Sequence, residues 1–474
     1  MKIMLVNPPA NHSITIPGST QILFEQHYFA PPLGIMYIKS YLQSVMDAEV
    51  KIFNFQVPNG PSIFDLEKTL IEFKPEVVGI TVMTVFWYDA CQIAKKVKEI
   101  LPNTIVVCGG SHTWLYPAES LSHRDFDVVV QGEGEITFTQ LIERLESGQD
   151  LEGLPGIWYR SDDQVIKNHP RPVEPEPDLF PFPDRSDFDI KQHRFPLDRY
   201  SPAAVVITSR GCPYHCTFCQ NNDHHYRRRL AERVVDEILE CKGMGYNSVD
   251  FYDDNFNQSR RHVESLCHEM IKHRVNMPWI CRARVDRIDR DLIKLMAETG
   301  CKRIHFGVES ATQRILDEIN KGINIEQARE AFALAKEAGI STVAYFIIGF
   351  PGETLEEANN TIALAFELDP DYPQCLALMP VPSTPIYEKA LKDLNFGGDY
   401  IRKYVMNPYP DLCVKIWPTA MTEKEILTIL RRFYLRFYFR PRQISRYISR
   451  LTSPEDLFTK VRMALKLIKL TMPR

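Results

Sequence analysis

The sequence contains no stretch of about 20 consecutive apolar residues, which a helix needs to span a bilayer. Its first ten residues, MKIMLVNPPA, lack the cleavage region of a secretory signal peptide, because Pro8 and Pro9 stand where small residues are needed. A charge excess is also lacking, since 56 Lys and Arg face 61 Asp and Glu, a net charge of -5. We therefore expect a cytoplasmic protein with no membrane-spanning helix and no nucleic-acid partner.

The cysteines lack the pattern of a disulfide framework. There are 11 of them, an odd number spread over 474 residues. Eight are scattered through apolar or helical segments, where small buried thiols are common: Cys91, Cys108, Cys241, Cys267, Cys281, Cys301, Cys375 and Cys413. The remaining three, Cys212, Cys216 and Cys219, fall within eight residues and need a separate explanation.

The pattern of apolar residues divides the chain into four parts. Over residues 1–150, short apolar runs alternate with amphipathic helical patterns, which predicts an α/β domain with a doubly wound, Rossmann-like parallel sheet. Residues 151–200 are rich in proline and acidic side chains, which predicts a linker. Residues 201–395 hold six further strand–helix units, which predict a partial (βα)6 barrel of the TIM type.

The last part, residues 396–474, is predicted to be a helical segment with a basic end. From residue 421 onward it has 13 Lys and Arg against 4 Asp and Glu. A basic amphipathic tail can contact a membrane surface or an anionic substrate. It can equally form a solvated helical cap over the mouth of the barrel, and the pattern leaves both interpretations open.

The three clustered cysteines lie in the segment TSRGCPYHCTFCQ (208–220), directly after a predicted strand. A closed zinc site needs a fourth ligand. Although His215 lies inside the segment, no second ligand pair follows at zinc-finger spacing. On a four-iron cluster, three cysteines leave one iron open to another ligand. The spacing therefore favours an iron–sulfur cluster over zinc.

This segment resembles the signature of the radical S-adenosylmethionine (SAM) superfamily, Cys-x3-Cys-x-aromatic-Cys, with Phe218 as the aromatic residue. In that family SAM binds the open iron of a 4Fe-4S cluster, and an electron from the cluster cleaves SAM to a 5′-deoxyadenosyl radical. The resemblance implies SAM contacts from residues of the cysteine loop and of the strand ends: Phe218, Asp253, Asp254, Arg284, Glu309, Gly349 and Pro351. Glu309 is implied at the SAM ribose, and no catalytic residue is assigned.

A doubly wound domain before such a barrel resembles the cobalamin-dependent class of radical SAM enzymes. The VNPP opening and the CGGSH and QGEGE turns are similar to that class, and no Gly-x-Gly-x-x-Gly motif indicates a dinucleotide instead. The resemblance implies cobalamin at the carboxyl ends of the strands, with contacts from Asn7, Pro8, Thr81, Gly109, Gly110, Ser111, His112, Gly132 and Glu133. The sequence departs from the Asp-x-His-x-x-Gly pattern of many cobalamin domains, which puts a histidine ligand to cobalt in doubt.

The resemblance implies methyl transfer to an unactivated carbon of a larger small-molecule or lipid-like substrate, with a flavodoxin- or ferredoxin-type electron donor. Other radical chemistry stays open, namely cyclisation, oxygenation or ring contraction, with or without bound cobalamin. A non-enzymatic iron–sulfur or zinc protein is a further alternative. The intact set of three cysteines and Glu309 argues against it.

Overall fold

The computed structural model describes residues 1–15, 17, 30–162, 164–192, 200–220 and 225–449, together with 457, 458, 461, 462 and 465. The chain forms two compact units. The N-terminal unit comprises the described residues of Met1–Thr15, Phe29–Gln192 and Asp399–Cys413. The barrel unit contains the described residues of Ile16–Tyr28, His193–Gly398 and Val414–Arg474.

The N-terminal unit is built on a seven-stranded sheet in the order β2-β1-β3-β4-β5-β6-β7. Its first five strands are parallel and its last two are antiparallel. The strands are β1 (Lys2–Asn7), β2 (Glu49–Asn54), β3 (Val77–Thr81), β4 (Ile105–Gly109), β5 (Val128–Val130), β6 (Ile157–Ser161) and β7 (Gln164–Lys167). Strand order reverses between β1 and β3, so this is a doubly wound sheet whose ligand crevice is expected at that switch point.

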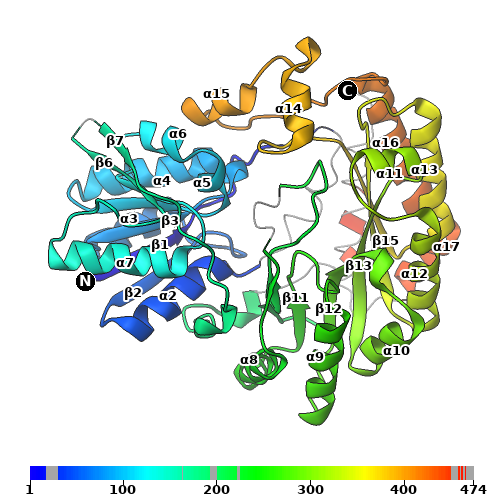
Figure 1. Ribbon diagram of the computed structural model, residues 1–474, viewed down its shortest axis with the longest axis horizontal. Coiled ribbons are helices and arrows are strands. Elements are labelled where there is room, and N and C mark those ends of the chain that lie inside the picture. Colours follow the sequence, from blue (N-terminus) through cyan, green and yellow to red (C-terminus); the bar gives the residue numbers. More distant parts are fainter. Residues whose placement is uncertain are drawn as a thin grey trace. The chain divides into compact units, whose positions relative to one another are not determined.

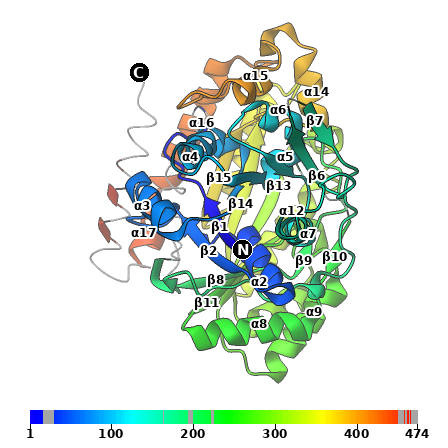
Figure 2. The same cartoon turned by 90° about the vertical axis from the view of Figure 1, so that its left-hand side faces the viewer.

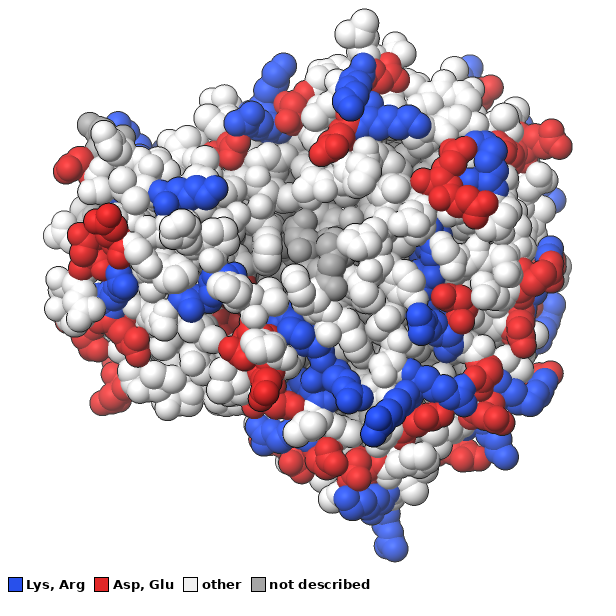
Figure 3. Space-filling model, viewed as in Figure 1, with Lys and Arg blue, Asp and Glu red and all other residues white. Residues whose placement is uncertain are grey.

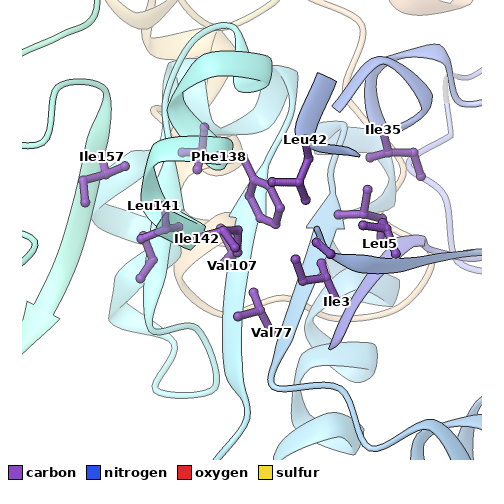
Figure 4. Close-up of a cluster of buried hydrophobic side chains, with 14 of the residues drawn as sticks. Ile3, Leu5, Ile35, Leu42, Val77, Val107, Phe138, Leu141, Ile142 and Ile157 are labelled. Atoms are coloured by element: carbon purple, nitrogen blue, oxygen red, sulfur yellow. The ribbon is translucent and has the colours of Figure 1, made fainter. Parts of the chain in front are cut away.

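Helices cover both faces of this sheet, with α2 beside α7 on one face and α3 beside α4 on the other (Figures 1 and 2). The helices of this unit are α2 (Leu33–Val45), α3 (Ile63–Phe73), α4 (Trp87–Ile100), α5 (Ser111–Leu115), α6 (Pro117–Ser122), α7 (Gly134–Ser147) and α15 (Tyr400–Met406). Leu42 of α2 and Phe138 of α7 pack against strand residues such as Leu5 in a buried apolar cluster (Figure 4). Burial of these side chains is the main term that holds the sheet to its helices.

Two segments differ from the predicted layout. Strands β6 and β7 lie inside residues 151–200, for which we predict a linker, and they extend the sheet as an antiparallel hairpin. Helix α15, from the predicted C-terminal part, belongs to the N-terminal unit. The indole of Trp87 donates to the carbonyl of Val405 at 2.9 Å, and Arg402 pairs with Glu119 at 2.7 Å. Such long-range contacts leave no local mark in a sequence.

The barrel unit contains a six-stranded parallel sheet in the order β15-β14-β13-β12-β11-β8, as the prediction of a partial barrel requires. Its strands are β8 (Ala203–Val206), β11 (Ser248–Phe251), β12 (Trp279–Ala283), β13 (Cys301–Glu309), β14 (Ser341–Ile348) and β15 (Tyr372–Ala377). A short antiparallel pair, β9 (Ser209–Arg210) with β10 (Arg227–Arg228), stands beside it. The predicted fold class is confirmed.

Helices of the barrel unit follow its strands and cover the outside of the sheet (Figure 1). They are α8 (Ala231–Met244), α9 (Arg260–Lys272), α10 (Arg290–Glu298), α11 (Gln313–Glu318), α12 (Ile325–Glu337), α13 (Leu355–Leu368), α14 (Pro385–Leu391), α16 (Glu423–Tyr438) and α17 (Pro441–Ile448). None of the described helices is long and apolar enough to cross a membrane.

Three basic residues, one directly before α17 and two within it, have an acidic partner within the barrel unit. Arg440, Arg442 and Arg446 all pair with Asp369, which follows α13. Part of the basic excess of the tail therefore serves to dock α17. On the face seen in Figure 3, Lys and Arg side chains are interspersed with Asp and Glu.

Candidate functional site

The three clustered cysteines lie in a loop that the β9–β10 pair closes at its base. Cys212 and Cys216 are half-buried and Cys219 is exposed. Burial raises the pKa of the Cys212 thiol, the backbone of Tyr214 lowers it, and the nearby Asp254 and Cys216 raise it further. The contribution of Cys216 to the pKa of Cys212 agrees with two thiols that serve one centre.

Tyr214, between the first two cysteines, is clamped by two arginines. The guanidinium of Arg284 lies 3.7 Å from the centre of the Tyr214 ring, and Arg287 Nε donates to the Tyr214 hydroxyl at 3.0 Å. Arg284 also donates to Asp286 at 2.8 Å and to the carbonyl of Lys321 at 2.7 Å. The predicted SAM ligand Arg284 is therefore buried in a network that fixes the cysteine loop.

A strap of three residues after α11 joins the cysteine loop to the end of β13. The carbonyl of Ile319 accepts a hydrogen bond from Thr217 N at 2.9 Å, and Asn320 Nδ2 donates to the carbonyl of His215 at 3.1 Å. Lys321 Nζ then pairs with Glu309 Oε1 at 2.7 Å, with both side chains almost fully buried. The strap thus binds both the cysteine loop and Glu309, and it fixes their positions relative to each other.

Glu309 ends β13 in a left-handed conformation, with φ at 67°. A side chain at position 307 would leave no room for the ion pair between Glu309 and Lys321. A Cβ added there would lie 2.5 Å from Glu309 Oε1 and 2.9 Å from Lys321 Nζ. Lys321 Nζ also lies 5.9 Å from the centre of the Phe218 ring, so the aromatic residue of the cysteine motif and the predicted ribose acid share one neighbour.

The turn after β14 packs against the same loop. Phe350 makes an edge-on contact with Phe218, with ring centres 6.0 Å apart. Glu353 accepts hydrogen bonds from the backbone N–H groups of Gly349, at 2.5 Å, and Phe350, at 3.2 Å. Burial raises the pKa of Glu353 to about 7. The turn that contains Gly349 and Pro351, both predicted to contact SAM, is thus held beside the cysteine loop.

The two aspartates after β11 have different environments. Asp253 is buried and accepts hydrogen bonds from Thr208 N at 2.7 Å, Thr208 Oγ1 at 2.5 Å and Ser209 Oγ at 2.8 Å. Burial raises its pKa to about 6. Its contacts hold the strand end that leads into the cysteine loop. Asp254 is exposed and near Cys212, so of the two it is better placed to reach a ligand.

The donor set of the loop fits an iron–sulfur cluster. Among the described residues, no three His, Cys, Asp or Glu side chains lie close enough to bind a single metal ion. The three thiols of a four-iron cluster bind three different irons, so they need not meet at one point. None of the eleven cysteines, all of which lie in the described part of the chain, is joined in a disulfide.

Sequence reasoning missed the clamp and the strap. Lys321 follows Glu309 by twelve residues, and no pattern marks it as a partner of that acid. A turn signal was present, because Asn320 and Gly322 both have positive φ, at 53° and 65°. Such a signal predicts a turn but not the residues that the turn contacts.

In the N-terminal unit, most predicted cobalamin residues gather at the carboxyl ends of the parallel strands. Asn7 ends β1, where its side chain donates to Asn54 Oδ1 at 2.8 Å. Thr81 ends β3 and pairs in register with Gly109. The remaining positions in this set follow β1, β4 and β5: Pro8, Gly110, Ser111, Gly132 and Glu133. Strand ends on both sides of the β1/β3 switch point therefore carry small or polar residues, which fits a large polar cofactor.

Gly110 is required by the backbone of this edge. Its φ is 97°, and an added Cβ would lie 2.7 Å from the carbonyl oxygen of Val82. His112, two residues on, is fully buried and stacks on Trp87, with ring centres 4.2 Å apart. Burial lowers its pKa to about 3, so the ring is neutral. A contact between His112 and cobalamin stays a prediction, and it would require this ring to leave the interior.

The comparisons with known proteins agree with this arrangement. A model of the radical SAM superfamily matches residues 206–365, and one of the B12 binding domain matches residues 22–142. A protein of Pyrococcus horikoshii described as an uncharacterized methyltransferase is 35% identical over 93% of each chain. The anaerobic magnesium-protoporphyrin IX monomethyl ester cyclase of Rubrivivax gelatinosus is 29% identical, over 86% of this chain and 74% of its own.

Among solved structures, the radical SAM methyltransferase TsrM from Kitasatospora setae has a TM-score of 0.66 at 21% identity, over 82% of this chain and 76% of its own. At that identity the likeness shows the fold. Another structure of TsrM holds cobalamin and a [4Fe-4S] cluster.

The chain belongs to the radical SAM superfamily, within the class that carries a cobalamin-binding domain in front of the radical SAM domain. It is an enzyme whose cofactors are a 4Fe-4S cluster, SAM and cobalamin. The predicted family and cofactors are thus confirmed, whereas the contacts of individual residues with the cofactors stay predictions.

Proposed function

We propose that this enzyme is a methyltransferase that acts on an unactivated carbon of a larger substrate. The observation that carries the proposal is the joint framework of cysteine loop, strap and Glu309 in a chain that also has a cobalamin-binding domain. Its 35% identical relative is described as a methyltransferase, which supports the same reaction class.

In this proposal Cys212, Cys216 and Cys219 hold the cluster and Glu309 binds the ribose of SAM. The cluster, when bound, supplies the electron that cleaves SAM, and cobalamin supplies the capacity to carry a methyl group. The chain's own residues orient the ligands. Lys321 holds the Glu309 carboxylate in place. The contact of Tyr214 with Arg284 holds the cysteine loop near that carboxylate.

A radical cyclase is a second candidate. It is favoured by the 29% identity to the cyclase of Rubrivivax gelatinosus over most of both chains. The two reactions differ in what happens to the methyl group of SAM, because only methylation transfers it to cobalamin and then to substrate.

The experiment that tests the proposal follows that methyl group. We would reconstitute the protein anaerobically with iron, sulfide and hydroxocobalamin, then add methyl-labelled SAM and a flavodoxin with its reductant. We expect label on cobalamin together with 5′-deoxyadenosine. 5′-Deoxyadenosine without label on cobalamin would reject methylation and favour the cyclase.

The location and partners follow from the same chemistry. We propose a cytoplasmic location with a flavodoxin- or ferredoxin-type donor, since the cluster thiols need a reducing compartment.

We also propose a peripheral membrane contact through the C-terminal residues, where Leu457, Phe458, Val461 and Leu465 are exposed. We expect the protein to sediment with anionic but not with neutral phospholipid vesicles. If it sediments with neither kind of vesicle, the contact is rejected.

A further inference from the structure

The two faces of the barrel sheet differ in chemistry. Positions that face the helices are apolar and fully buried, among them Cys281, Phe306 and Phe346. The alternate positions include apolar side chains such as Ile280 and Val343, but they also carry a group of polar and charged ones: Asp250 on β11, Arg282 on β12, Arg303 and His305 on β13, and Tyr345 on β14. The interior of a closed (βα)8 barrel is usually filled by branched apolar side chains. A polar inner face therefore indicates a binding surface rather than a core.

An ion pair anchors one side of this inner face. Both terminal nitrogens of Arg282 bind the carboxylate of Asp250, which is fully buried. The guanidinium of Arg282 lies 4.0 Å from the centre of the Tyr252 ring, whose side chain is exposed. The ion pair is thus buried on the side of β11, whereas the neighbouring Tyr252 is exposed.

A histidine–tyrosine pair occupies the next two strands. His305 Nδ1 and the Tyr345 hydroxyl are 2.7 Å apart. Burial, together with the charges of Arg282 and Arg303, lowers the pKa of His305 well below its ordinary value, so the ring is neutral. Burial raises the pKa of Tyr345 to about 12, so the phenol keeps its proton. The pair therefore holds two protons, one on nitrogen and one on oxygen.

Only one of these protons can lie between the two atoms. If the phenol donates to Nδ1, the ring carries its proton on Nε2, which is buried without a hydrogen-bond partner among the described residues. If Nδ1 donates to the phenol oxygen, the phenol proton has no acceptor among the described residues, and Nε2 has no hydrogen-bond partner there either. Either way one donor lacks an acceptor. A buried donor without a partner costs about 1–3 kcal/mol, which a ligand with an acceptor atom would recover.

The pair lies close to the predicted ribose acid. Tyr345 is opposite Gly307 in the strand register, and beyond an irregularity in β13 its neighbour Phe346 is opposite Glu309. At about 3.3 Å per residue, Tyr345 is therefore roughly one residue before Glu309 along the strand direction. A substrate group bound there would hold its neighbouring carbons near the SAM ribose.

We propose that the His305–Tyr345 pair and Arg282 bind an acidic oxygen group of the substrate, a carboxylate or a phosphate, on the inner face of the barrel sheet. The positive charges of Arg282 and Arg303 both act on His305, and such a field favours an anion over a neutral acceptor. The inference rests on the proposed function, because it takes the bound group to belong to the radical's substrate. It excludes a pure hydrocarbon as the substrate.

The test compares three probes that share one apolar tail: hexanoate, hexyl phosphate and the neutral hexanamide. Each is titrated calorimetrically, under anaerobic conditions, into holoenzyme that holds cluster, cobalamin and SAM. We expect at least one acid to bind at least tenfold more tightly than the amide, and the preferred acid distinguishes carboxylate from phosphate. His305→Ala and Tyr345→Phe should each weaken that acid about tenfold, the value of one hydrogen bond to a charged group.

Ile304→Val is the matched control, because Ile304 is the outward-facing neighbour of His305 and is fully buried. It should leave acid binding unchanged. Tyr345→Phe removes only a hydroxyl, so it keeps the test valid if His305→Ala fails to fold. Equal binding of acid and amide, or unchanged acid binding in folded Tyr345→Phe, would overturn the inference.

The same samples, given reductant, are assayed for 5′-deoxyadenosine. If 5′-deoxyadenosine forms but the acids bind no more tightly than the amide, the inference is rejected and the proposed function is kept. The absence of 5′-deoxyadenosine despite acid preference rejects the proposed function and leaves the anion site standing.

Discussion

Replacing Lys321 with methionine removes the ammonium group that pairs with Glu309 and keeps a side chain of similar length. The two charged atoms are 2.7 Å apart, and the side chains are only 10% and 7% exposed. Because Glu309 would remain buried without its partner, we expect the variant to lose about 3–5 kcal/mol of unfolding free energy. The backbone of the strap, which binds the cysteine loop, is unchanged by this substitution.

Urea unfolding and SAM binding measure the two consequences. In Lys321→Met the Glu309 carboxylate is no longer held, so we expect SAM affinity to fall at least about tenfold, the equivalent of 1.4 kcal/mol, with the iron content unchanged. Glu309→Ala should likewise keep the cluster and weaken SAM. The double variant Glu309→Gln/Lys321→Met should recover most of the stability, because no charge is left buried.

Lys294→Met is the matched control, since Lys294 is 75% exposed and its distance to Glu298 is 4.0 Å. It should change stability by less than about 0.5 kcal/mol. If Lys321→Met unfolds at the same urea concentration as the wild type and binds SAM equally well, the strap does not position Glu309 and the reasoning is refuted.

Three further predictions concern the loop, its support and the N-terminal unit. Tyr214→Leu removes the ring beneath Arg284, a contact worth about 2 kcal/mol when shielded, so iron content after reconstitution should fall, whereas Tyr214→Phe should retain it. The pKa of Asp253 is about 6 in the folded state, above the ordinary carboxyl value of about 3.9, so its stabilising contribution is present in acid and lost as pH rises through about 6. From pH 5 to pH 8, urea unfolding should show wild type losing about 1.5 kcal/mol more than Asp253→Asn, and parallel profiles would contradict this. Gly110→Ala should cost about 1–3 kcal/mol, because φ is 97° and Cβ would meet Val82. Cobalamin retention after gel filtration should fall with it, and wild-type retention at an unchanged melting temperature would count against the account.

The local sequence pattern was sufficient to predict most strands and helices and the class of the cysteine site. Short apolar runs marked the five parallel strands of the N-terminal sheet and the six strands of the barrel sheet, but not β6 and β7, and the spacing of Cys212, Cys216 and Cys219 marked the cluster loop. Both signals are short-range, since a strand and a ligand loop are each defined by consecutive residues. Long-range contacts were not predictable in this way. The attachment of α15 to the N-terminal unit depends on Trp87, more than 300 residues earlier.

The roles of single polar residues were harder to assign. Asp253 and Asp254 are adjacent in the sequence, yet one is buried under Thr208 and the other is exposed, because successive side chains of a strand end point to opposite faces. The same alternation could have revealed the inner face of the barrel. In CKRIHFGVE, polar side chains or glycine recur at Arg303, His305, Gly307 and Glu309, which is the period of a strand with one polar face.

The most direct test of the central claim is the amount of 5′-deoxyadenosine formed from SAM by the anaerobically reconstituted, reduced protein. We predict that the wild type forms it, that Cys216→Ala forms none because its cluster cannot assemble, and that Cys413→Ala, which alters an exposed cysteine outside the loop, forms as much as the wild type. A wild-type preparation that holds about four irons and yields no 5′-deoxyadenosine, or a Cys216→Ala variant that yields as much as the wild type, would contradict the account.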